Sequence, residues 1–290
     1  VVALNVACRT ALRPGEMVMT PSPIYAPFTE ASENMERGHV KTFLSDVNGR
    51  MELDFDAISN LVNEEIKMFF FCNPQNPGGT VFSQSEIEQL VGVCLENDIL
   101  ICSDEIHSDL ILDEDKQHIH LASLSKEIEQ NSITLLGPCK TFNLAGFPMA
   151  AAIIPNKQLR EDFRRYMNGI VAHLDSVALV ATKAAYTKAD DWHQELISYL
   201  RKNREILQNG INSIEGLSLK GPEASYLSWI DCRESNLVSP RDFILENAKV
   251  GVYDSDWFGS KDYLRLNFAC PQSRLVEAIE RIQKAFSQRN

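Results

Sequence analysis

Short apolar, β-prone runs alternate with amphipathic helical patterns through the first half of the chain. Runs of this kind with helices between them are typical of a parallel sheet that is covered by helices on both faces. The pattern therefore predicts an α/β fold with a large, doubly wound, mainly parallel sheet. The predicted strands cover residues 17–20, 40–44, 68–72, 99–103, 132–136 and 149–154.

Two helices stand out between and after these runs. Ser83 is followed three residues later by Glu86 and then by apolar residues at helical spacing, which predicts a helix with a capping-box start. Residues 175–212 contain few helix breakers and predict a long helix that links two lobes. We therefore expect a large domain at residues 1–190 and a small C-terminal domain at residues 191–290.

The last third of the chain has a different pattern, typical of a smaller α+β domain packed against the first. We expect strands at 217–219, 226–231 and 263–268, a helix near 241–247 and a closing helix from Gln272.

Composition and charge exclude several classes of partner. The chain has 28 Lys and Arg against 40 Asp and Glu, and the net charge of −12 repels nucleic-acid phosphates and anionic lipid head groups. The apolar runs are far shorter than the roughly 20 residues of a membrane-spanning helix. We therefore expect neither nucleic acid nor membrane as a partner. The seven cysteines occur without a C-x-x-C pair, which favours buried, reduced thiols and a cytoplasmic location.

Three polar loop segments follow predicted strands, at residues 73–79 (NPQNPGG), 103–107 (SDEIH) and 137–146 (GPCKTFNLAG). Because the carboxyl ends of parallel strands meet at one edge of a sheet, we expect these segments to converge on one site. Taken singly, each segment also fits a turn, a helix cap or a surface lysine. The combination, in this order, is far more specific than any one of them.

With these segments the chain resembles the fold-type I pyridoxal phosphate (PLP) enzymes, the aminotransferase class I/II superfamily. The resemblance implies PLP as the cofactor. Lys140 would form the imine with PLP, Asp104 would pair with the pyridine nitrogen, and Asn76 would bond the phenolic oxygen. These residue types suit the roles, because a buried carboxylate holds a proton on the ring nitrogen and a desolvated lysine loses its own more readily.

The same resemblance assigns three further residues. His107, where the family usually has Tyr, would lie beside the phenolic oxygen, and Tyr25 of the TPSPIY segment would stack on the ring. Arg265 of the YLRLNFA segment would bind the substrate α-carboxylate through a planar fork that Lys cannot reproduce. The resemblance also implies a homodimer and cis peptide bonds at Ser22–Pro23 and Asn76–Pro77.

Within the superfamily, the chain is most similar to the carbon–sulfur lyases, the cystathionine β-lyase and cysteine desulfhydrase group. The segments that carry this similarity are 104–110 (DEIHSDL), 140–146 (KTFNLAG), 255–259 (SDWFG) and 264–271 (LRLNFACP). The similarity implies an enzyme that cleaves cystathionine or a cysteine-type amino acid to pyruvate, ammonia and a thiol. An aminotransferase is the alternative, and a regulatory protein without catalysis is a more remote one.

Several positions depart from the family pattern. Cys139 stands directly before the lysine, and Pro148 occupies the position eight residues after it, where a cation usually holds the cofactor phosphate. Val1 falls within the first turn of the helix that would cradle this phosphate, so we expect an N-terminal truncation and weak PLP binding. His118 and His120 could be two metal ligands, but without a further ligand nearby they favour a solvated loop, and we predict no metal site.

Overall fold

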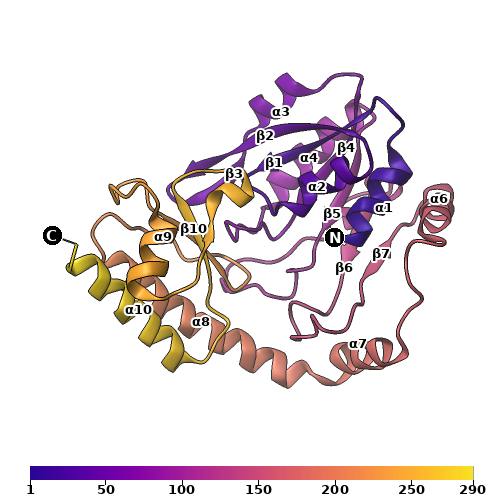
Figure 1. The fold of residues 1–290 in the computed structure, drawn as a ribbon. Helices are drawn as coiled ribbons and strands as arrows, with labels where there is room; N and C mark the ends of the chain where they lie inside the picture. The colour runs from indigo at the N-terminus through magenta and orange to yellow at the C-terminus, as the bar shows by residue number, and fades with distance from the viewer. Residues whose placement is uncertain (290) are drawn as a thin grey trace.

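The computed structural model describes residues 1–289, and within them seven strands form one large sheet in the order β3-β2-β1-β4-β5-β6-β7 (Figure 1). The central pairs are parallel, whereas β3 and β7 at the edges run antiparallel to their neighbours. The predicted α/β class with a mainly parallel sheet is confirmed. The strands are β1 (Met17–Ser22), β2 (Gly38–Val47), β3 (Arg50–Leu53), β4 (Ile66–Cys72), β5 (Leu100–Asp104), β6 (Ser132–Leu136) and β7 (Ala151–Ile153).

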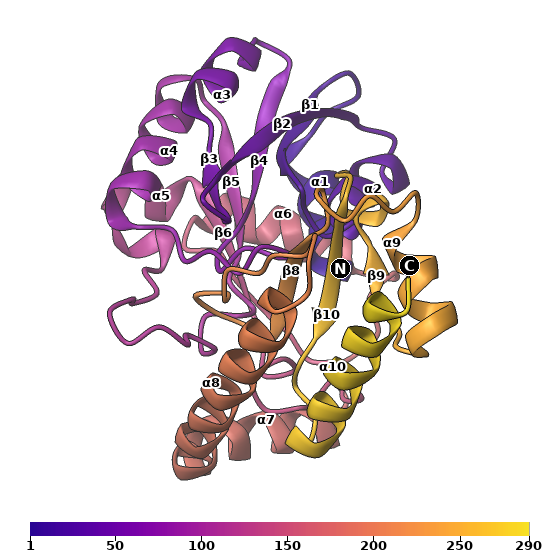
Figure 2. The same ribbon diagram turned by 90° about the vertical axis from the view of Figure 1, so that its left-hand side faces the viewer.

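Both faces of the central strands are buried, as in a doubly wound sheet. In β4, Met68 and Phe70 pack with one core cluster and Phe69 and Phe71 pack with the other. Helices α1, α2 and α6 cover the first face, and α3, α4 and α5 cover the second (Figure 2). These helices are α1 (Val2–Ala11), α2 (Pro27–Asn34), α3 (Phe55–Leu61), α4 (Gln84–Glu96), α5 (Lys126–Gln130) and α6 (Lys157–Met167).

The two helices that the sequence predicts in detail have different outcomes. The capping box of α4 is confirmed, because Ser83 and Glu86 each accept a hydrogen bond from the other's backbone N–H. The long helix at 175–212 is wrong, because the chain forms α7 (Ser176–Lys188) and α8 (Asp190–Asn212). Lys188 suits a helix C-terminus and the acidic first turn of α8 suits an N-terminus, so the helix dipoles favour a break between them.

A second, three-stranded antiparallel sheet lies in the C-terminal part of the chain, in the order β8-β10-β9. Helices α8 and α10 lie side by side over one of its faces, where they pack against Leu264 and Leu266 (Figure 2). Tyr263 and Arg265 alternate with these leucines and therefore face the large sheet. The elements are β8 (Leu227–Asp231), α9 (Pro240–Phe243), a π-helical turn η2 (Ile244–Ala248), β9 (Tyr253–Asp254), a 3-10 turn η3 (Ser255–Phe258), β10 (Tyr263–Asn267) and α10 (Gln272–Ser287).

Two predicted strands need correction. Residues 217–219 form no strand, and a single bridge joins Ser218 to Asp231. The strand predicted at 149–154 is the short β7, and it is antiparallel to β6. A parallel pair needs a crossover connection, and residues 137–150 lead from β6 to β7 without a helix.

In the part of the chain that the structure describes, no helix combines the length and the apolar character that a bilayer crossing requires. All seven cysteines are free thiols, and five of them are buried.

Candidate active site

Four of the predicted site residues lie at the same edge of the large sheet. Tyr25 comes after the end of β1, Asn76 after β4 and Lys140 after β6, and Asp104 is the last residue of β5. These four strands are mutually parallel, so all four positions lie at carboxyl ends, where open α/β sheets bind ligands.

The loops that carry Tyr25 and Asn76 are joined to each other. The side-chain amide of Gln75 donates a hydrogen bond to the carbonyl of Pro23 at 2.7 Å. The predicted cis peptide bonds at Ser22–Pro23 and Asn76–Pro77 are both present, and Asn73–Pro74 is also cis.

Asp104 is fixed by its place in the sheet, between Cys72 of β4 and Leu135 of β6. One carboxylate oxygen accepts a hydrogen bond from the backbone N–H of Ile106 at 3.1 Å. Burial raises the pKa of Asp104 to about 6, although that hydrogen bond and the charge of Lys140 both act to lower it. Its surroundings therefore neutralise the carboxylate incompletely. A protonated ring nitrogen would supply the missing positive charge, so this residue fits the pyridine end of PLP.

Lys140 lies in the turn after β6, which backbone hydrogen bonds within residues 138–144 hold in place. Its positive charge acts on Asp104 and also on His107. Burial, followed by the charges of Lys140 and Arg265, lowers the pKa of His107 to about 3. The imidazole of His107 is therefore neutral at physiological pH. Lys140 lies near both Asp104 and His107, two of the residues that would surround the cofactor.

His107 is bonded to a segment that the sequence analysis did not single out. Its Nδ1 lies 3.1 Å from the hydroxyl of Ser225, and its ring centroid lies 6.0 Å from that of Tyr226. The rule that strand ends converge applies to the large sheet alone, so no sequence signal marked Ser225 or Tyr226, at the start of the strand expected at 226–231, as a site residue.

Arg265 reaches the same site from β10. It donates a hydrogen bond to the side-chain oxygen of Asn76 at 3.0 Å. Its guanidinium carbon lies 4.6 Å from the ring centroid of Tyr253 and also 4.6 Å from that of Phe258. The aromatic faces and the amide hold the guanidinium plane in one orientation, which bidentate carboxylate binding requires.

Tyr25 lies at the border between the two sheets. Its ring makes an edge contact with Trp257, with centroids 5.1 Å apart and planes at 76°. The charge of Arg265 also acts on its hydroxyl, whose pKa is raised chiefly by burial. The guanidinium carbon of Arg265 lies 5.9 Å from the ring centroid of the same Trp257, so Tyr25 and Arg265 flank one aromatic ring.

The helix expected to hold the cofactor phosphate is α1. This helix packs against β4 and β5, the strand that ends at Asp104, so α1 lies beside the site. The N–H groups of a first helical turn and the helix dipole favour an anion. The half-buried Cys139 adds no charge here, because burial raises the pKa of its thiol.

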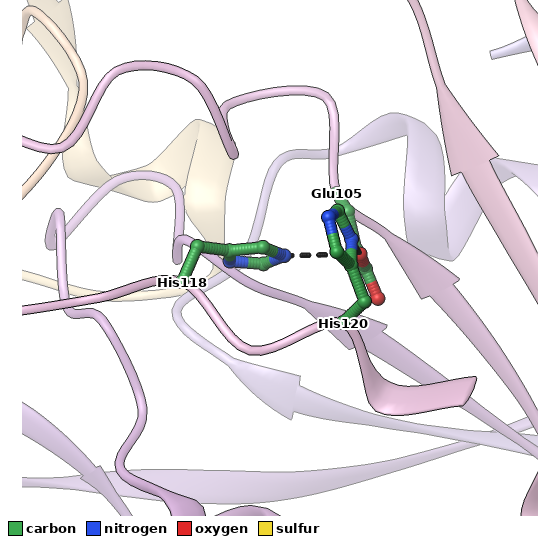
Figure 3. Close-up of side chains that lie close together, drawn as sticks. All are labelled: Glu105, His118 and His120. Carbon is green, nitrogen blue, oxygen red and sulfur yellow. Dashed lines mark hydrogen bonds and ion pairs between the residues drawn. The ribbon is translucent and has the colours of Figure 1, made fainter. Parts of the chain in front are cut away.

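A second cluster lies just after the end of β5, where Glu105 contacts two histidines of the following loop (Figure 3). One oxygen of Glu105, Oε2, lies 3.0 Å from Nε2 of His118 and also bonds Nδ1 of His120. The His118 side chain is only 5% exposed. The expectation that no further ligand lies nearby is therefore wrong, because the loop returns to β5, where the backbone N–H of Leu121 bonds Glu105. His120 itself is exposed, as expected of a solvated loop.

Glu105 is fully buried and satisfied at both carboxylate oxygens. Its Oε1 accepts hydrogen bonds from the Ser103 hydroxyl at 2.9 Å and from the Leu121 N–H at 3.1 Å. Burial alone would raise the pKa of Glu105, but the bonds and charges of His118 and His120 lower it to about 2. The same carboxylate raises the pKa of His120.

Comparison with known proteins gives relatives over the whole chain. Residues 1–282 match the family described as aminotransferase class I and II. The chain is 33% identical to the cystathionine beta-lyase PatB of Bacillus subtilis (strain 168), over 99% of this chain and 76% of that protein. It is 29% identical to the PLP-bound C–S lyase structure from Staphylococcus hominis, with a TM-score of 0.89 over 98% of this chain and 74% of that one.

Aminotransferases are also among the relatives. The probable aspartate/prephenate aminotransferase of Aquifex aeolicus (strain VF5) is 26% identical, over 94% of this chain and 71% of that protein. The family match includes both sheets and all six predicted site residues. The chain therefore belongs to the aminotransferase class I and II family.

Proposed function

We propose that this protein is a PLP-dependent carbon–sulfur lyase that cleaves cystathionine or a cysteine-type amino acid to pyruvate, ammonia and a thiol. The observation that carries the proposal is that Asp104 and Lys140 lie at the carboxyl ends of the adjacent strands β5 and β6, and that Arg265 reaches the same edge through its hydrogen bond to Asn76. The 33% identity to a cystathionine beta-lyase supports the choice of reaction.

The residues divide the work of holding the cofactor. Asp104 would keep the proton on the pyridine nitrogen, and Asn76 and His107 would lie at the phenolic side. Tyr25 would cover the ring, and the first turn of α1 would take the phosphate. When bound, PLP supplies an electron sink for negative charge at the substrate Cα.

The same side chains would act on the substrate. Arg265 would bind the α-carboxylate with two parallel hydrogen bonds, because its plane is already fixed by Tyr253, Phe258 and Asn76. Lys140 would accept the Cα proton as general base. The negative charge left at Cα would expel the β-sulfur, which takes up a proton to leave as a thiol, and water would hydrolyse the released 2-aminoacrylate to pyruvate and ammonia.

An aminotransferase would share each of these roles up to the loss of the Cα proton, after which the β-sulfur would stay in place and the amino group would be transferred. It is less favoured, because the aminotransferase relative is 26% identical and the lyase relative is 33% identical. A regulatory protein without catalysis is less favoured still, since Lys140, Asp104, Asn76 and Arg265 are all present and converge.

Incubation of the PLP-loaded protein with L-cystathionine alone tests the proposal. A lyase releases pyruvate and a thiol in equal amounts without an added oxoacid. Glutamate formed only from an amino acid plus 2-oxoglutarate, with no thiol in the first incubation, would establish the aminotransferase instead.

The proposal includes assembly as a homodimer. Large apolar side chains are exposed around α7, with Ile170 80% exposed, Leu174 62% and Val180 68%, and a second copy would cover them. Sedimentation equilibrium tests the dimer, and a monomer at micromolar concentration would exclude it.

The proposal also places the protein in the cytoplasm. The free thiols fit a reducing compartment.

The division into lobes also stays a proposal. We place the boundary at the start of α8, because Leu200 and Leu207 of that helix pack with the core of the small sheet. Limited proteolysis near Ala189 would test this placement, and a first cut inside α8 would contradict it.

A further inference from the structure

Asp104 and Glu105, adjacent at the end of β5, point to opposite faces of the large sheet. Side chains alternate along a strand, so Ser103 and Glu105 share one face and Asp104 points to the other. Asp104 faces the candidate active site, and Glu105 faces the loop that contains His118 and His120. The proposed reaction uses no member of this second cluster.

Three possible ligand atoms converge in the cluster. A ring nitrogen of His118, a ring nitrogen of His120 and a carboxylate oxygen of Glu105 all lie within 4.8 Å of one another (Figure 3). In a tetrahedral zinc site, bonds of about 2.0–2.1 Å place neighbouring ligand atoms roughly 3.3 Å apart. Small side-chain rotations would therefore open the cluster around an ion.

The bonding of His118 points inward to the cluster. Its side chain is only 5% exposed, and within residues 1–289 its other ring nitrogen, Nδ1, is buried without a hydrogen-bond partner. Nε2 is thus the ring nitrogen that bonds the cluster, and in the part of the chain that the structure describes the ring is oriented by packing, without the acceptor behind it that zinc-bound histidines usually have.

We propose that Glu105, His118 and His120 form a Zn²⁺ site. Two imidazoles and one carboxylate are a ligand set that zinc uses, with water in the fourth position. His120 is 54% exposed, which leaves a side open for ion entry and for that water. The carboxylate of Asp109 lies near enough to act on His120 and adds negative potential at the opening.

The surroundings of Glu105 also suit a ligand. Its second oxygen is held by the Ser103 hydroxyl and the Leu121 N–H, and metal-binding carboxylates are usually oriented by such bonds. An ion here would fasten residues 113–121 to the end of β5, one residue from Asp104. The site is separate from the proposed lyase chemistry and does not depend on it.

The test is zinc titration of the PLP-loaded protein by calorimetry after treatment with a chelator. We expect one Zn²⁺ per chain, unaffected by millimolar Mg²⁺, since Mg²⁺ prefers oxygen ligands. His120→Gln should weaken this binding by at least about 100-fold, because even the loss of a group that only orients a ligand costs about 10- to 100-fold. Because His120 is half-exposed, its substitution should disturb the fold less than substitution of the buried Glu105 or His118.

His173→Gln is the matched control, because His173 is exposed and lies outside the cluster. It should bind zinc as the unmodified protein does. Equal zinc affinity in the His120 and His173 variants would place the ion elsewhere and overturn the proposal, as would the absence of saturable binding. The cluster would then be a hydrogen-bonded clamp only.

Visible spectra of the Co²⁺-substituted protein give a second readout. Four-coordinate Co²⁺ absorbs far more strongly than six-coordinate Co²⁺, so the proposed site should give intense bands that the His120→Gln protein lacks. Weak bands equal in both proteins would contradict the proposal even where both proteins bind the ion.

Discussion

Asp104 and Glu105 are neighbours in sequence with the same ionisable group, and the fold shifts their pKa values in opposite directions. The pKa of Asp104 is raised to about 6, whereas that of Glu105 is lowered to about 2. Burial opposes the charged form of both. The difference lies in their partners: Asp104 accepts one backbone hydrogen bond, and Glu105 accepts bonds from Ser103, Leu121 and two histidines.

The contrast separates two uses of a buried carboxylate. Glu105 is saturated with donors, so its ionised form stabilises the fold. Asp104 has too few donors and positive charges around it to stabilise its ionised form fully, and a positively charged ligand can supply what is missing. Groups with strongly perturbed pKa values cluster at functional sites. Because side chains alternate along β5, Asp104 can face the active site while its neighbour Glu105 stabilises the opposite face of the sheet.

The largest expected effect is the loss of turnover in Lys140→Ala. Without the amine, neither attachment of the cofactor nor removal of the Cα proton is possible, and we expect a fall of at least about 10³-fold. Pyruvate release from L-cystathionine and the absorbance of lysine-bound cofactor measure it. The exposed Lys157→Ala is the control, and turnover within a few-fold of the control would refute the assignment of Lys140.

Asp104→Asn should retain cofactor and lose about 10²- to 10³-fold in kcat, because a neutral amide cannot hold the ring proton. Glu105→Gln is the matched comparison on the other face of the strand. It should change kcat by less than about tenfold in protein that remains folded. Equal losses in both variants would remove the distinction between the two carboxylates.

Glu105→Gln should instead reduce stability. The carboxylate pKa falls from 4.5 to about 2 on folding, which corresponds to about 3 kcal/mol of unfolding free energy at neutral pH. Urea unfolding at pH 7.5 measures the loss. A change below about 1 kcal/mol would show that the histidine and backbone bonds to Glu105 contribute little.

Much of the active-site edge could be predicted from sequence because it depends on local rules. Strand ends set the positions of Asn76, Asp104 and Lys140, and the parallel pairing of their strands follows from the alternation of strands and helices. The orientation of Arg265 could not be predicted, because it depends on the pairing of β10 with β9, which sets Tyr253 opposite Arg265, and on the packing of the small sheet against the loop that carries Asn76.

The second cluster shows why sequence spacing alone fails. His118 lies 13 residues after Glu105, a separation with no fixed geometry in an irregular loop. Their contact depends on the return of the chain to β5 at Leu121. The prediction that residues 149–154 form a parallel strand was wrong for a related reason. Only the path of the connecting segment shows that β7 must be antiparallel to β6.

The pH dependence of stability should distinguish the two carboxylates in cofactor-free protein. The depressed pKa of Glu105 gives stability that is present above about pH 4.5 and is lost as the pH falls towards 2. The raised pKa of Asp104 acts with the opposite sign, so stability is lost as the pH rises from 3.8 through 6. Each contributes up to about 1.4 kcal/mol per pH unit in its window.

Urea midpoints between pH 2 and 8 test both signs. The lowered pKa values of His107 and His39 contribute a rise in stability over part of the same range, so the test is the difference from the unsubstituted protein. Relative to that protein, Asp104→Asn should gain stability steadily between pH 4 and 6, and Glu105→Gln should flatten the rise below pH 4.5. Addition of PLP to the unsubstituted protein should give the same relative gain, because the cofactor supplies the positive charge that Asp104 lacks. A constant difference between Asp104→Asn and the unsubstituted protein across pH 4 to 6 would contradict the raised pKa of Asp104.

The smallest effect tests how Glu105 is held. Ser103→Ala removes one of its donors, a buried hydroxyl 2.9 Å from Oε1, while the Leu121 N–H still bonds that oxygen. We expect a loss of about 1.5 kcal/mol, the lower end for a hydrogen bond to a charged group. Ser132→Ala on the neighbouring strand is the matched control, because within residues 1–289 the buried Ser132 hydroxyl has no partner and its removal should cost less than about 0.5 kcal/mol. Equal urea midpoints for the two variants at pH 7.5 would mean that the Ser103 hydroxyl is redundant and that the Leu121 N–H, His118 and His120 suffice to hold the ionised carboxylate.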